Sequence, residues 1–491
     1  MSSDIEAGNS ASTQYQAVLQ LAAERSQAYL AHIGERFVGV RQAALQQMAS
    51  LGGALPTVGE DPLAVVRLLD DVGSPATMAI MGGRFFGGII GGSLPVTVAA
   101  HWLADAWNQN ACLYDLSPVA AYVEGVVLDW LIALFELPNG TAGALVTGTQ
   151  MADVTALAAA RHALLRRCGW NVERDGLFGA PHITVIVGEE VHATILKALS
   201  ILGFGKARVL TVPADAQGRM RATEIPRISG PTIVCAQVGN VNSGACDPIA
   251  DICEVAHAGD AWVHVDGAFG MWAFTAPARR HLVEGVTLAD SWATDGHKWL
   301  NTPLDCGIAF VRDAEALGRA MSISGAYYGP AGSRDPMRWG PESSRRARAV
   351  DLWAALRSLG RDGIAAQIER TCQHATKFAR CLRDAGYAVV NDVVLNQVLV
   401  SFGSDATTER VIGAVQRDGT CWCGGTVWKG RTAMRISVSS WATTDEDVVR
   451  SVDAICGAAE RIRRGKPVSE DGTAVFDPPA LADTAGHVRR R

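Results

Sequence analysis

A lysine and an aspartate in two short, separate segments have the types and spacing that cofactor chemistry needs. Lys298 lies in the run Ser-Trp-Ala-Thr-Asp-Gly-His-Lys-Trp-Leu-Asn (291–301). Thirty-two residues earlier, a mostly apolar stretch (261–266) ends in Asp266. A lysine that forms a Schiff base, together with an aspartate that pairs with a pyridinium nitrogen, is the combination that pyridoxal phosphate requires.

Each of these two residues also has an ordinary structural explanation when it is taken alone. An aspartate at the end of a strand often caps the next helix, and most lysines are simply exposed. Lys298 is flanked by His297 and Trp299, which disfavours simple exposure. The pair of segments therefore favours the cofactor interpretation more than either segment does.

Two further segments could contribute to such a site. Residues 147–151 read Thr-Gly-Thr-Gln-Met between a predicted strand and a predicted helix, so their backbone amides could bind a phosphate group. No Gly-Lys-Ser/Thr follows, which excludes a Walker motif. His192 opens the helix predicted after the strand at 183–188, where it could stack on a ring or serve only as a cap or a core residue.

The middle of the chain alternates short apolar strands with helices, which predicts an α/β fold with a mostly parallel sheet. Helices are expected at 152–167, 192–202 and 248–258. Seven strands are expected, at 143–147, 183–188, 208–212, 232–239, 261–266, 291–294 and 306–312. Their low content of charged residues is typical of a sheet that is covered on both faces.

The flanking regions have different patterns. Helical spacing at 13–50, a short helix at 62–69 and helical spacing at 95–134 precede the sheet. Later elements predict a small α+β lobe, with helices at 345–359, 363–385 and 446–463 and strands at 387–390, 397–402 and 433–439. We therefore expect four parts: an N-terminal helical segment (1–95), a large domain (96–342), a small domain (343–465) and a flexible polar tail (466–491).

Composition excludes several classes of protein. The 491 residues include 44 Lys and Arg against 50 Asp and Glu, and a net charge of −6 argues against a nucleic-acid binder. Eleven cysteines without metal-ligand spacing predict free thiols in the cytoplasm and no metal site. The polar N-terminus is not a signal peptide. Residues 85–104 lack charges but contain four glycines and a proline, so a buried loop that leads into a helix is expected, and no membrane span.

The sequence from about residue 85 to 439 resembles the pyridoxal phosphate-dependent group II amino-acid decarboxylases, which include the aromatic amino-acid, glutamate, histidine and cysteine-sulfinate decarboxylases. The resemblance depends on His-Val-Asp-Gly-Ala (264–268), Asp-Gly-His-Lys-Trp-Leu (295–300) and the histidine-bearing turn at His192. It implies a type I fold with a seven-stranded sheet, a homodimer and pyridoxal 5′-phosphate as the cofactor.

The resemblance also implies a role for each matching residue. Lys298 would be the Schiff-base lysine, Asp266 the partner of the pyridine nitrogen, and Ala268 and His192 the two walls of the ring. The phosphate group would be held by Gly148, Thr149, Gln150, Asp295 and His297. Tyr327, in Ser-Gly-Ala-Tyr-Tyr-Gly (324–329), matches a loop tyrosine that returns a proton after carbon dioxide leaves, and Tyr328 lies beside it. Either Tyr327 or His192 would help to return that proton.

Some positions depart from the family pattern. Val241 stands where many members have a threonine near the phenolic oxygen of the cofactor, so Asn240 or Asn242 could donate that hydrogen bond instead. The segment 84–93 matches a region that lines the substrate pocket, but it could equally be a packing turn at the dimer interface. Arg435 matches an arginine near the active site, which could meet a carboxylate or serve the fold.

The expected function is the decarboxylation of an L-amino acid to the amine and carbon dioxide. The alternatives are another reaction of the same cofactor (transamination, carbon–carbon lyase chemistry or oxidative deamination with decarboxylation) and a non-catalytic protein on the same fold. A loop tyrosine at Tyr327 favours the decarboxylase, because the carbanion that remains must be protonated. The identity of the amino acid does not follow from the sequence.

Overall fold

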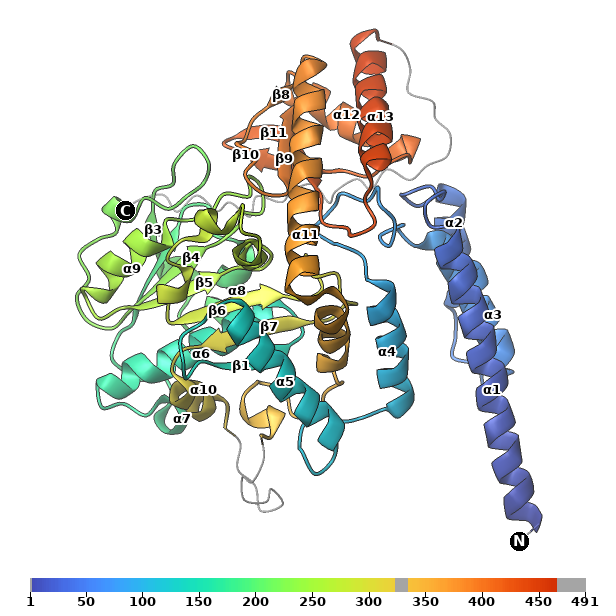
Figure 1. The fold of residues 1–491 in the computed structure, drawn as a ribbon, viewed down its shortest axis with the longest axis horizontal. Coiled ribbons are helices and arrows are strands. Elements are labelled where there is room, and N and C mark those ends of the chain that lie inside the picture. Colours follow the sequence, from blue (N-terminus) through green and yellow to red (C-terminus); the bar gives the residue numbers. More distant parts are fainter. Residues whose placement is uncertain (1, 323–333, 466–491) are drawn as a thin grey trace.

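The computed structural model describes residues 2–322 and 334–465, with the side chains from residue 12 onward (Figure 1). A seven-stranded sheet with the order β1-β7-β6-β5-β4-β2-β3 lies at its centre. All seven strands match those predicted from the sequence. They are β1 (Ala142–Val146), β2 (Thr184–Gly188), β3 (Leu210–Val212), β4 (Thr232–Gln237), β5 (Trp262–Asp266), β6 (Ser291–Asp295) and β7 (Gly307–Val311).

The sheet is mostly parallel, as expected for the type I fold. Strands β2 to β6 pair in parallel, whereas β7 is antiparallel to both β6 and β1. The exception follows from the connection: only residues 296–306 join β6 to β7, which is too short for a crossover helix. Strand β1 consequently runs in the same direction as β6, so their carboxyl ends lie at one edge of the sheet.

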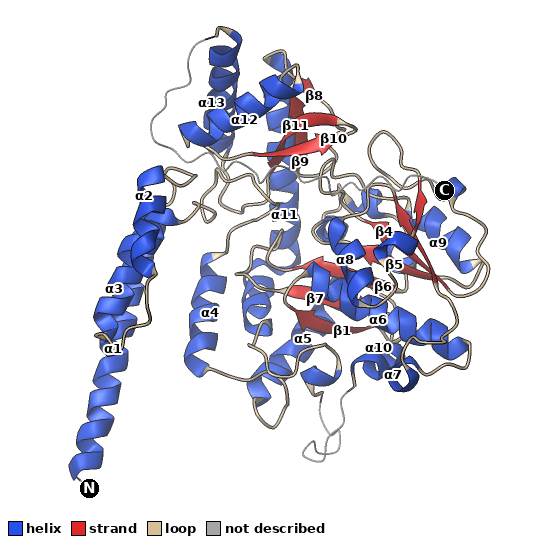
Figure 2. Cartoon of the chain, turned by 180° about the vertical axis from the view of Figure 1, so that it is seen from behind, coloured by secondary structure: helices blue, strands red, loops and turns tan. Residues whose placement is uncertain are grey.

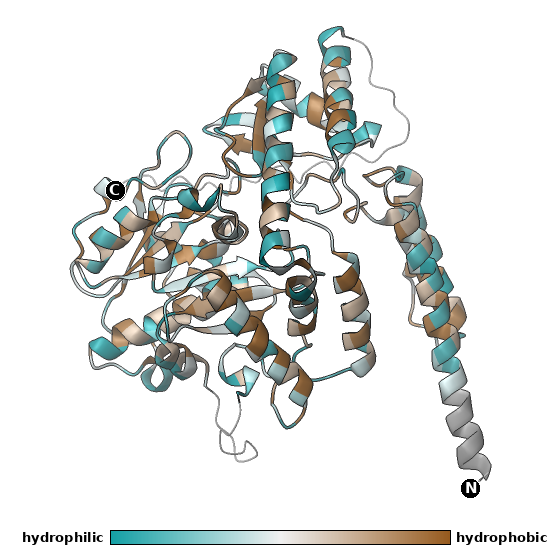
Figure 3. Ribbon diagram, in the orientation of Figure 1, coloured by the Kyte–Doolittle hydropathy of each residue, from teal (hydrophilic) through white to brown (hydrophobic). Residues whose placement is uncertain are grey.

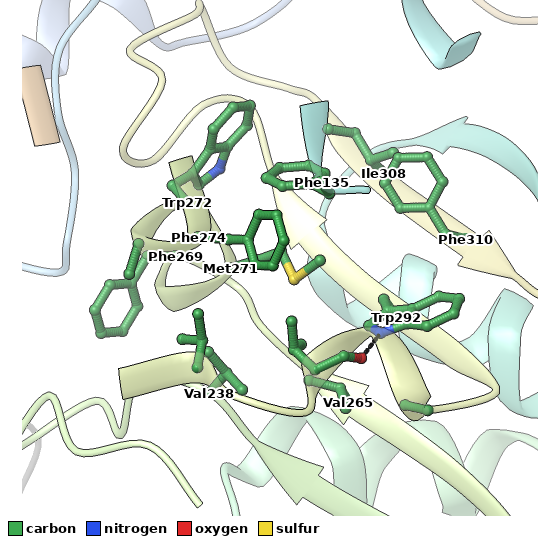
Figure 4. Packing of buried hydrophobic residues seen from close by; sticks show 14 of the residues in the cluster. Phe135, Val238, Val265, Phe269, Met271, Trp272, Phe274, Trp292, Ile308 and Phe310 are labelled. Atoms are coloured by element: carbon green, nitrogen blue, oxygen red, sulfur yellow. Dashed lines mark hydrogen bonds between the residues drawn. The ribbon is translucent and has the colours of Figure 1, made fainter. Parts of the chain in front are cut away.

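Helices cover both faces of this sheet (Figure 2). Residues of α6 (Thr149–Arg167), α8 (Ala193–Ile201) and α10 (Ala314–Met321) form one apolar cluster with β2 and β4. The other face packs against α5 (Pro118–Leu134) and α9 (Ile249–His257). Figure 4 shows part of this second cluster, in which the Trp292 indole donates a hydrogen bond of 2.7 Å to the Val286 carbonyl.

Alternation along β5 determines which side chains reach the site. Val263 and Val265 belong to the cluster shown in Figure 4, whereas Trp262 belongs to the cluster around α6. Because side chains alternate along a strand, His264 and Asp266 share the α6 face with Trp262. This face carries the polar residues described below.

The small lobe contains a four-stranded antiparallel sheet with the order β10-β11-β9-β8. The sequence predicted three of these strands and missed β10, as well as α12 in the small lobe and α10 in the large one. The predicted break near residue 360 is present, because Gly360 has φ 60° and ψ −177° inside α11. The elements are α11 (Ala349–Asp384), β8 (Ala388–Val389), β9 (Gln397–Ser401), α12 (Asp405–Asp418), β10 (Gly424–Trp428), β11 (Arg431–Ser437) and α13 (Asp445–Arg463).

The N-terminal helices stand away from the two sheets (Figures 1 and 2). Helices α1 (Ser2–Ala31) and α3 (Pro62–Gly73) lie side by side, and Arg25 forms ion pairs with Asp70 and Asp71. The region 13–50 is largely helical, as expected, but the chain turns after Ala31 and the helical pattern resumes only at α2. Further helices are α2 (Gln42–Gln47), α4 (Pro95–Trp107) and α7 (Val172–Asp175).

Short 3₁₀ turns complete the secondary structure. They are η1 (Met48–Leu51), η2 (Ser74–Ala76), η3 (Lys206–Arg208), η4 (Ala222–Glu224), η5 (Gly270–Thr275), η6 (Arg280–Val283), η7 (Val286–Leu288) and η8 (Pro336–Arg338). Among the described residues, no helix is both long and apolar enough to cross a membrane.

The glycine-rich segment 84–94 connects the small lobe to the loop after Lys298. The Phe86 amide donates to the Trp422 carbonyl at 2.9 Å, and the Leu94 amide donates to the Asn301 carbonyl at 2.8 Å. Gly91 packs so closely that a Cβ atom there would overlap the Asn301 amide and the Lys298 carbonyl. As the sequence predicted, the segment is a buried loop that leads into α4.

Candidate active site

The carboxyl ends of the parallel strands and the loops that follow them surround one cavity of about 130 Å³. This edge is where ligands bind in open α/β sheets. Eight of the residues expected at a cofactor site line it: Thr149, Gln150, His192, Asp266, Ala268, Asp295, His297 and Lys298. The remaining lining residues are Ile89, Thr194, Gln237, Gly239, Val241 and Phe269.

Lys298 lies three residues beyond the end of β6 and is held by an ion pair. Its Nζ atom is 2.9 Å from Oδ2 of Asp295, and 24% of its side-chain surface is exposed. Burial favours the neutral amine, but the carboxylate of Asp295, with Asp266 and Asp153 farther away, outweighs this effect and raises the pKa of Lys298. The lysine is therefore a restrained ammonium group before any cofactor is attached.

Asp266 ends β5 and is buried, with 4% of its surface exposed. Its Oδ1 atom accepts a hydrogen bond of 3.1 Å from the Ala268 amide. Burial raises the pKa of this carboxyl group, although His192 and Lys298 oppose the shift. A second positive charge, such as a protonated ring nitrogen, would favour the ionised carboxylate, so this position fits the nitrogen of pyridoxal phosphate.

His192 caps α8 and faces the same cavity. Its Nδ1 atom lies 2.8 Å from Thr194 Oγ1 and accepts from the Thr194 amide at 3.4 Å, so the ring proton is on Nε2. Burial lowers the pKa of His192, aided by the charges of Lys298 and Arg435 and opposed by Asp266. The imidazole is therefore neutral near pH 7. Ala268, which lines the same cavity, leaves room for a flat ring.

The turn before α6 has the features of a phosphate site. Thr149 Oγ1 is buried and has no hydrogen-bond partner among the residues that the structure describes, although the Thr149 amide donates to Asp295 Oδ1 at 2.7 Å. His297 accepts from the Cys306 amide through Nδ1 at 3.0 Å, so its Nε2 atom carries the proton. An orphaned hydroxyl group beside an N–H donor and a helix N-terminus fits the phosphate of the expected cofactor.

Gly148 is extended, and it lies against the start of β7. A Cβ atom at Gly307 would overlap the Gly148 backbone, which shows how closely the turn and β7 approach. Asp295, which is expected to help hold the phosphate, lies at this turn. Its carboxylate holds the Thr149 amide and Lys298, and it therefore joins the turn to the lysine.

The turn at 239–245 lies at the other side of the cavity. Asn240 Oδ1 accepts from the amides of Asn242 and Ser243, and Asn242 Oδ1 accepts from Thr426 Oγ1 at 2.8 Å. Neither asparagine lines the cavity. Arg435 of β11 donates to the Val241 carbonyl at 3.4 Å, and no carboxylate of the described chain lies within 4 Å of its guanidinium group.

A buried network of hydrogen-bonded side chains, which the sequence did not predict, lies around His264, two residues before Asp266. His264 Nε2 contacts Asp153 Oδ1 at 3.1 Å, and His264 Nδ1 contacts Ser291 Oγ at 2.9 Å. Trp262 donates to the same Ser291 oxygen at 2.8 Å, so Ser291 joins Trp262 and His264, and both ring nitrogens of His264 have partners. Burial lowers the pKa of His264 to about 3, and the ring stays neutral.

The sequence missed Thr194, Gln237 and Phe269 as lining residues. Gln237 lies within the strand predicted at 232–239, but its pairing with Asp266 in the ladder is visible only in the structure. Tyr327 and Tyr328 lie outside the described residues, and the proton-donor role expected for Tyr327 stays a prediction. Within the described residues, no group of three or more His, Cys, Asp or Glu side chains could hold a metal ion.

Comparison with known proteins agrees with this geometry. The family model described as "Pyridoxal-dependent decarboxylase conserved domain" matches residues 84–403. Tryptophan decarboxylase 1 of Oryza sativa subsp. japonica is 31% identical over 397 residues, which cover 72% of this chain and 76% of the relative. L-2,4-Diaminobutyrate decarboxylase of Rhizobium meliloti (strain 1021) is 30% identical over 436 residues, which cover 84% and 83%.

The fold of this chain also resembles solved structures. The crystal structure of Oryza sativa TDC with PLP and tryptamine aligns with a TM-score of 0.84 at 24% identity, covering 92% of this chain and 98% of the other. The expected cofactor, pyridoxal phosphate, and the expected carboxy-lyase class are therefore confirmed. The chain belongs to the pyridoxal phosphate-dependent group II amino-acid decarboxylases, which have the type I fold.

Proposed function

We propose that this protein removes the α-carboxylate of an L-amino acid as carbon dioxide, with Lys298 as the Schiff-base residue that carries the cofactor. The observation that supports this most strongly is the position of Lys298 Nζ. It lies 2.9 Å from Asp295 in the cavity that Asp266, Ala268 and His192 also line. Within this enclosed space, the lysine provides the point of attachment for the cofactor, the aspartate provides a charge for the ring nitrogen, and the imidazole provides a contact for the ring face.

When bound, pyridoxal phosphate supplies the electron sink for decarboxylation. The protein holds it at both ends: Thr149 and His297 bind the phosphate, and Asp266 keeps the ring nitrogen protonated. Gly148 and Gln150 complete the phosphate turn. Asp295 orients Lys298 and the Thr149 amide together, so the attachment point and the phosphate site keep a fixed spacing.

In this proposal, His192 and Tyr327 are the residues that position and transfer the proton. The neutral imidazole of His192 presents Nε2–H to the cavity, because Nδ1 is occupied by Thr194. Tyr327 would return the proton to the carbon atom that loses carbon dioxide. Arg435 lacks a carboxylate partner in the described chain, which supports a role in binding the carboxylate of the substrate.

We further propose that the chain acts as a cytoplasmic homodimer divided into parts 1–95, 96–342, 343–465 and 466–491. Apolar side chains exposed on α4 and α5 support a partner surface, and both helices are strongly hydrophobic in Figure 3. They include Trp102, Leu103, Trp107, Tyr122 and Trp130. Helices α1 and α3 also lie away from the rest of the chain, where a second copy could pack against them (Figure 1).

A substrate panel tests the reaction. The purified holoenzyme is incubated with aromatic, acidic and basic L-amino acids, and carbon dioxide, amine, aldehyde and keto acid are quantified. Carbon dioxide and amine in equal amounts support decarboxylation, whereas a keto acid or an aldehyde would replace the proposal with transamination or oxidative deamination. Lys298→Ala should abolish both turnover and borohydride labelling. A wild-type protein that gains no visible absorption with pyridoxal phosphate would refute the role of Lys298.

A further inference from the structure

Gln237 occupies a position in the cavity to which none of the roles above is assigned. It is the last residue of β4, and its direct neighbour in the parallel ladder is Asp266 of β5. Gln237 lines the cavity, and alternation along β4 puts its side chain on the α6 face, together with Ile233 and Cys235. Its backbone amide is fixed by a 2.7 Å hydrogen bond to Asp247 Oδ2, but its carboxamide makes no hydrogen bond with any described residue.

The order of the strands determines which edge of the cofactor faces this carboxamide. Asp295 ends β6 and holds the phosphate turn, Asp266 ends β5, and Gln237 ends β4. Asp266 therefore lies between the phosphate side and Gln237. On the pyridine ring, the phosphate arm and the phenolic oxygen are on opposite edges with respect to the line through the nitrogen atom. A ring with its nitrogen at Asp266 and its phosphate at Thr149 consequently presents its phenolic edge to β4.

The other side chains on this side of the cavity are apolar or do not reach it: Asn240 Nδ2 is buried without a hydrogen-bond partner among the described residues, but Asn240 does not line the cavity. The lining residues contributed by β4 and its following turn are Gln237, Gly239 and Val241, and only Gln237 has a polar side chain. The carbonyl oxygens of Asn240 and Asn242 accept bonds within the turn and from Thr426, and neither residue lines the cavity.

We propose that the carboxamide of Gln237 donates a hydrogen bond to the phenolic oxygen of pyridoxal phosphate. The –NH₂ group is a donor, and the phenolic oxygen is an acceptor that carries negative charge in the bound cofactor. The bond is strongest when the nitrogen atom that links the cofactor to Lys298 has lost its proton, because the phenolic oxygen then has no other donor. Gln237 thereby lowers the pH at which this nitrogen titrates. This inference depends on cofactor binding and not on the reaction proposed above.

The test is a pH titration of the visible absorption of the holoenzyme, together with the dissociation constant of the cofactor. Gln237→Met keeps an unbranched chain but removes the donor, and Asn242→Met removes an amide from the adjacent turn as the matched control. In Gln237→Met we expect the titration to move up by about one pH unit and the dissociation constant to rise about tenfold. The control should stay within twofold of the wild type.

Two results would overturn the assignment: a Gln237→Met holoenzyme that titrates and binds like the wild type, or an equal shift in Asn242→Met. If Gln237→Met does not fold, Gln237→Glu is the second variant. Its carboxylate would face the phenolic oxygen with a like charge, so the titration should move up further than one unit. A Gln237→Glu titration at the wild-type pH would refute the proposal. None of these outcomes depends on which product the enzyme forms.

Discussion

The ion pair between Lys298 and Asp295 predicts how readily the protein takes up its cofactor. Only a neutral amine attacks the aldehyde group of pyridoxal phosphate, whereas the carboxylate at 2.9 Å stabilises the ammonium form. Burial acts in the opposite direction but is outweighed, so the pKa of Lys298 lies above its ordinary value. Asp295→Asn keeps a carbonyl oxygen for the Thr149 amide and removes the charge.

The size of the effect follows from the type of contact. A hydrogen bond between two charged groups in a site that is largely shielded from water contributes about 1.5–3 kcal/mol. Because one pKa unit corresponds to about 1.4 kcal/mol, the pKa of Lys298 should fall by about one to two units in Asp295→Asn. The direction of the pH dependence of stability follows from the raised pKa of Lys298. The wild-type ion pair stabilises the apoprotein at neutral pH, and this stabilisation disappears only as pH rises through that raised pKa.

The assay is the rate of holoenzyme formation, followed by visible absorption after apoprotein is mixed with pyridoxal phosphate at pH 6–10. Throughout this range, the rate for Asp295→Asn at a given pH should match the wild-type rate measured one to two pH units higher. Asp305→Asn is the matched control, because Asp305 pairs with Arg348 at 2.8 Å and does not line the cavity. Identical pH profiles for Asp295→Asn and the wild type would refute the reasoning.

Three further predictions concern stability. Gly91→Ala should lower the free energy of unfolding by about 2–3 kcal/mol because its Cβ atom overlaps the active-site loop, whereas Gly59→Ala, with open space around it, should change little in the same urea titration. The His264 pKa of about 3 means that the unfolded chain binds a proton that the folded chain excludes, so stability falls by about 1.4 kcal/mol for each pH unit below 6.5. His264→Gln should reduce that slope between pH 6 and 4. Arg345→Met leaves the buried carboxylate of Glu124 unpaired and should cost about 3–5 kcal/mol; if the double variant with Glu124→Leu is no more stable, the ion pair is not the cause.

The large sheet was predictable because each strand is a short apolar run between helices. The small lobe was less predictable. Strand β10 reads Gly-Gly-Thr-Val-Trp, only its last residue is buried, and two glycines are a poor strand signal. The turn after Ala31 was also missed, since helical spacing continues on both sides of it. In both cases, contacts between distant segments determine the structure, and the local sequence pattern does not reveal those contacts.

The site was predictable where residues follow one another along the chain. Lys298, Asp266 and His192 each occur in a recognisable segment, and the structure places all three around one cavity. Gln237 was missed because its importance comes from the neighbouring strand, which the sequence does not specify. Asp153 was missed for the same reason, since its contact with His264 joins residues that are 111 positions apart.

The pairing of β1 with β7 has a consequence for the synthesis of the protein. Strand β1 lies at the edge of the sheet, and its partner for Val146 is Gly307, 161 residues later (307 − 146). On the ribosome, β1 emerges long before that partner exists. The turn that contains Gly148 therefore reaches its final place only after β7 has been translated. Until then, the growing chain carries β1 as an unpaired strand, and unpaired strands are prone to aggregate.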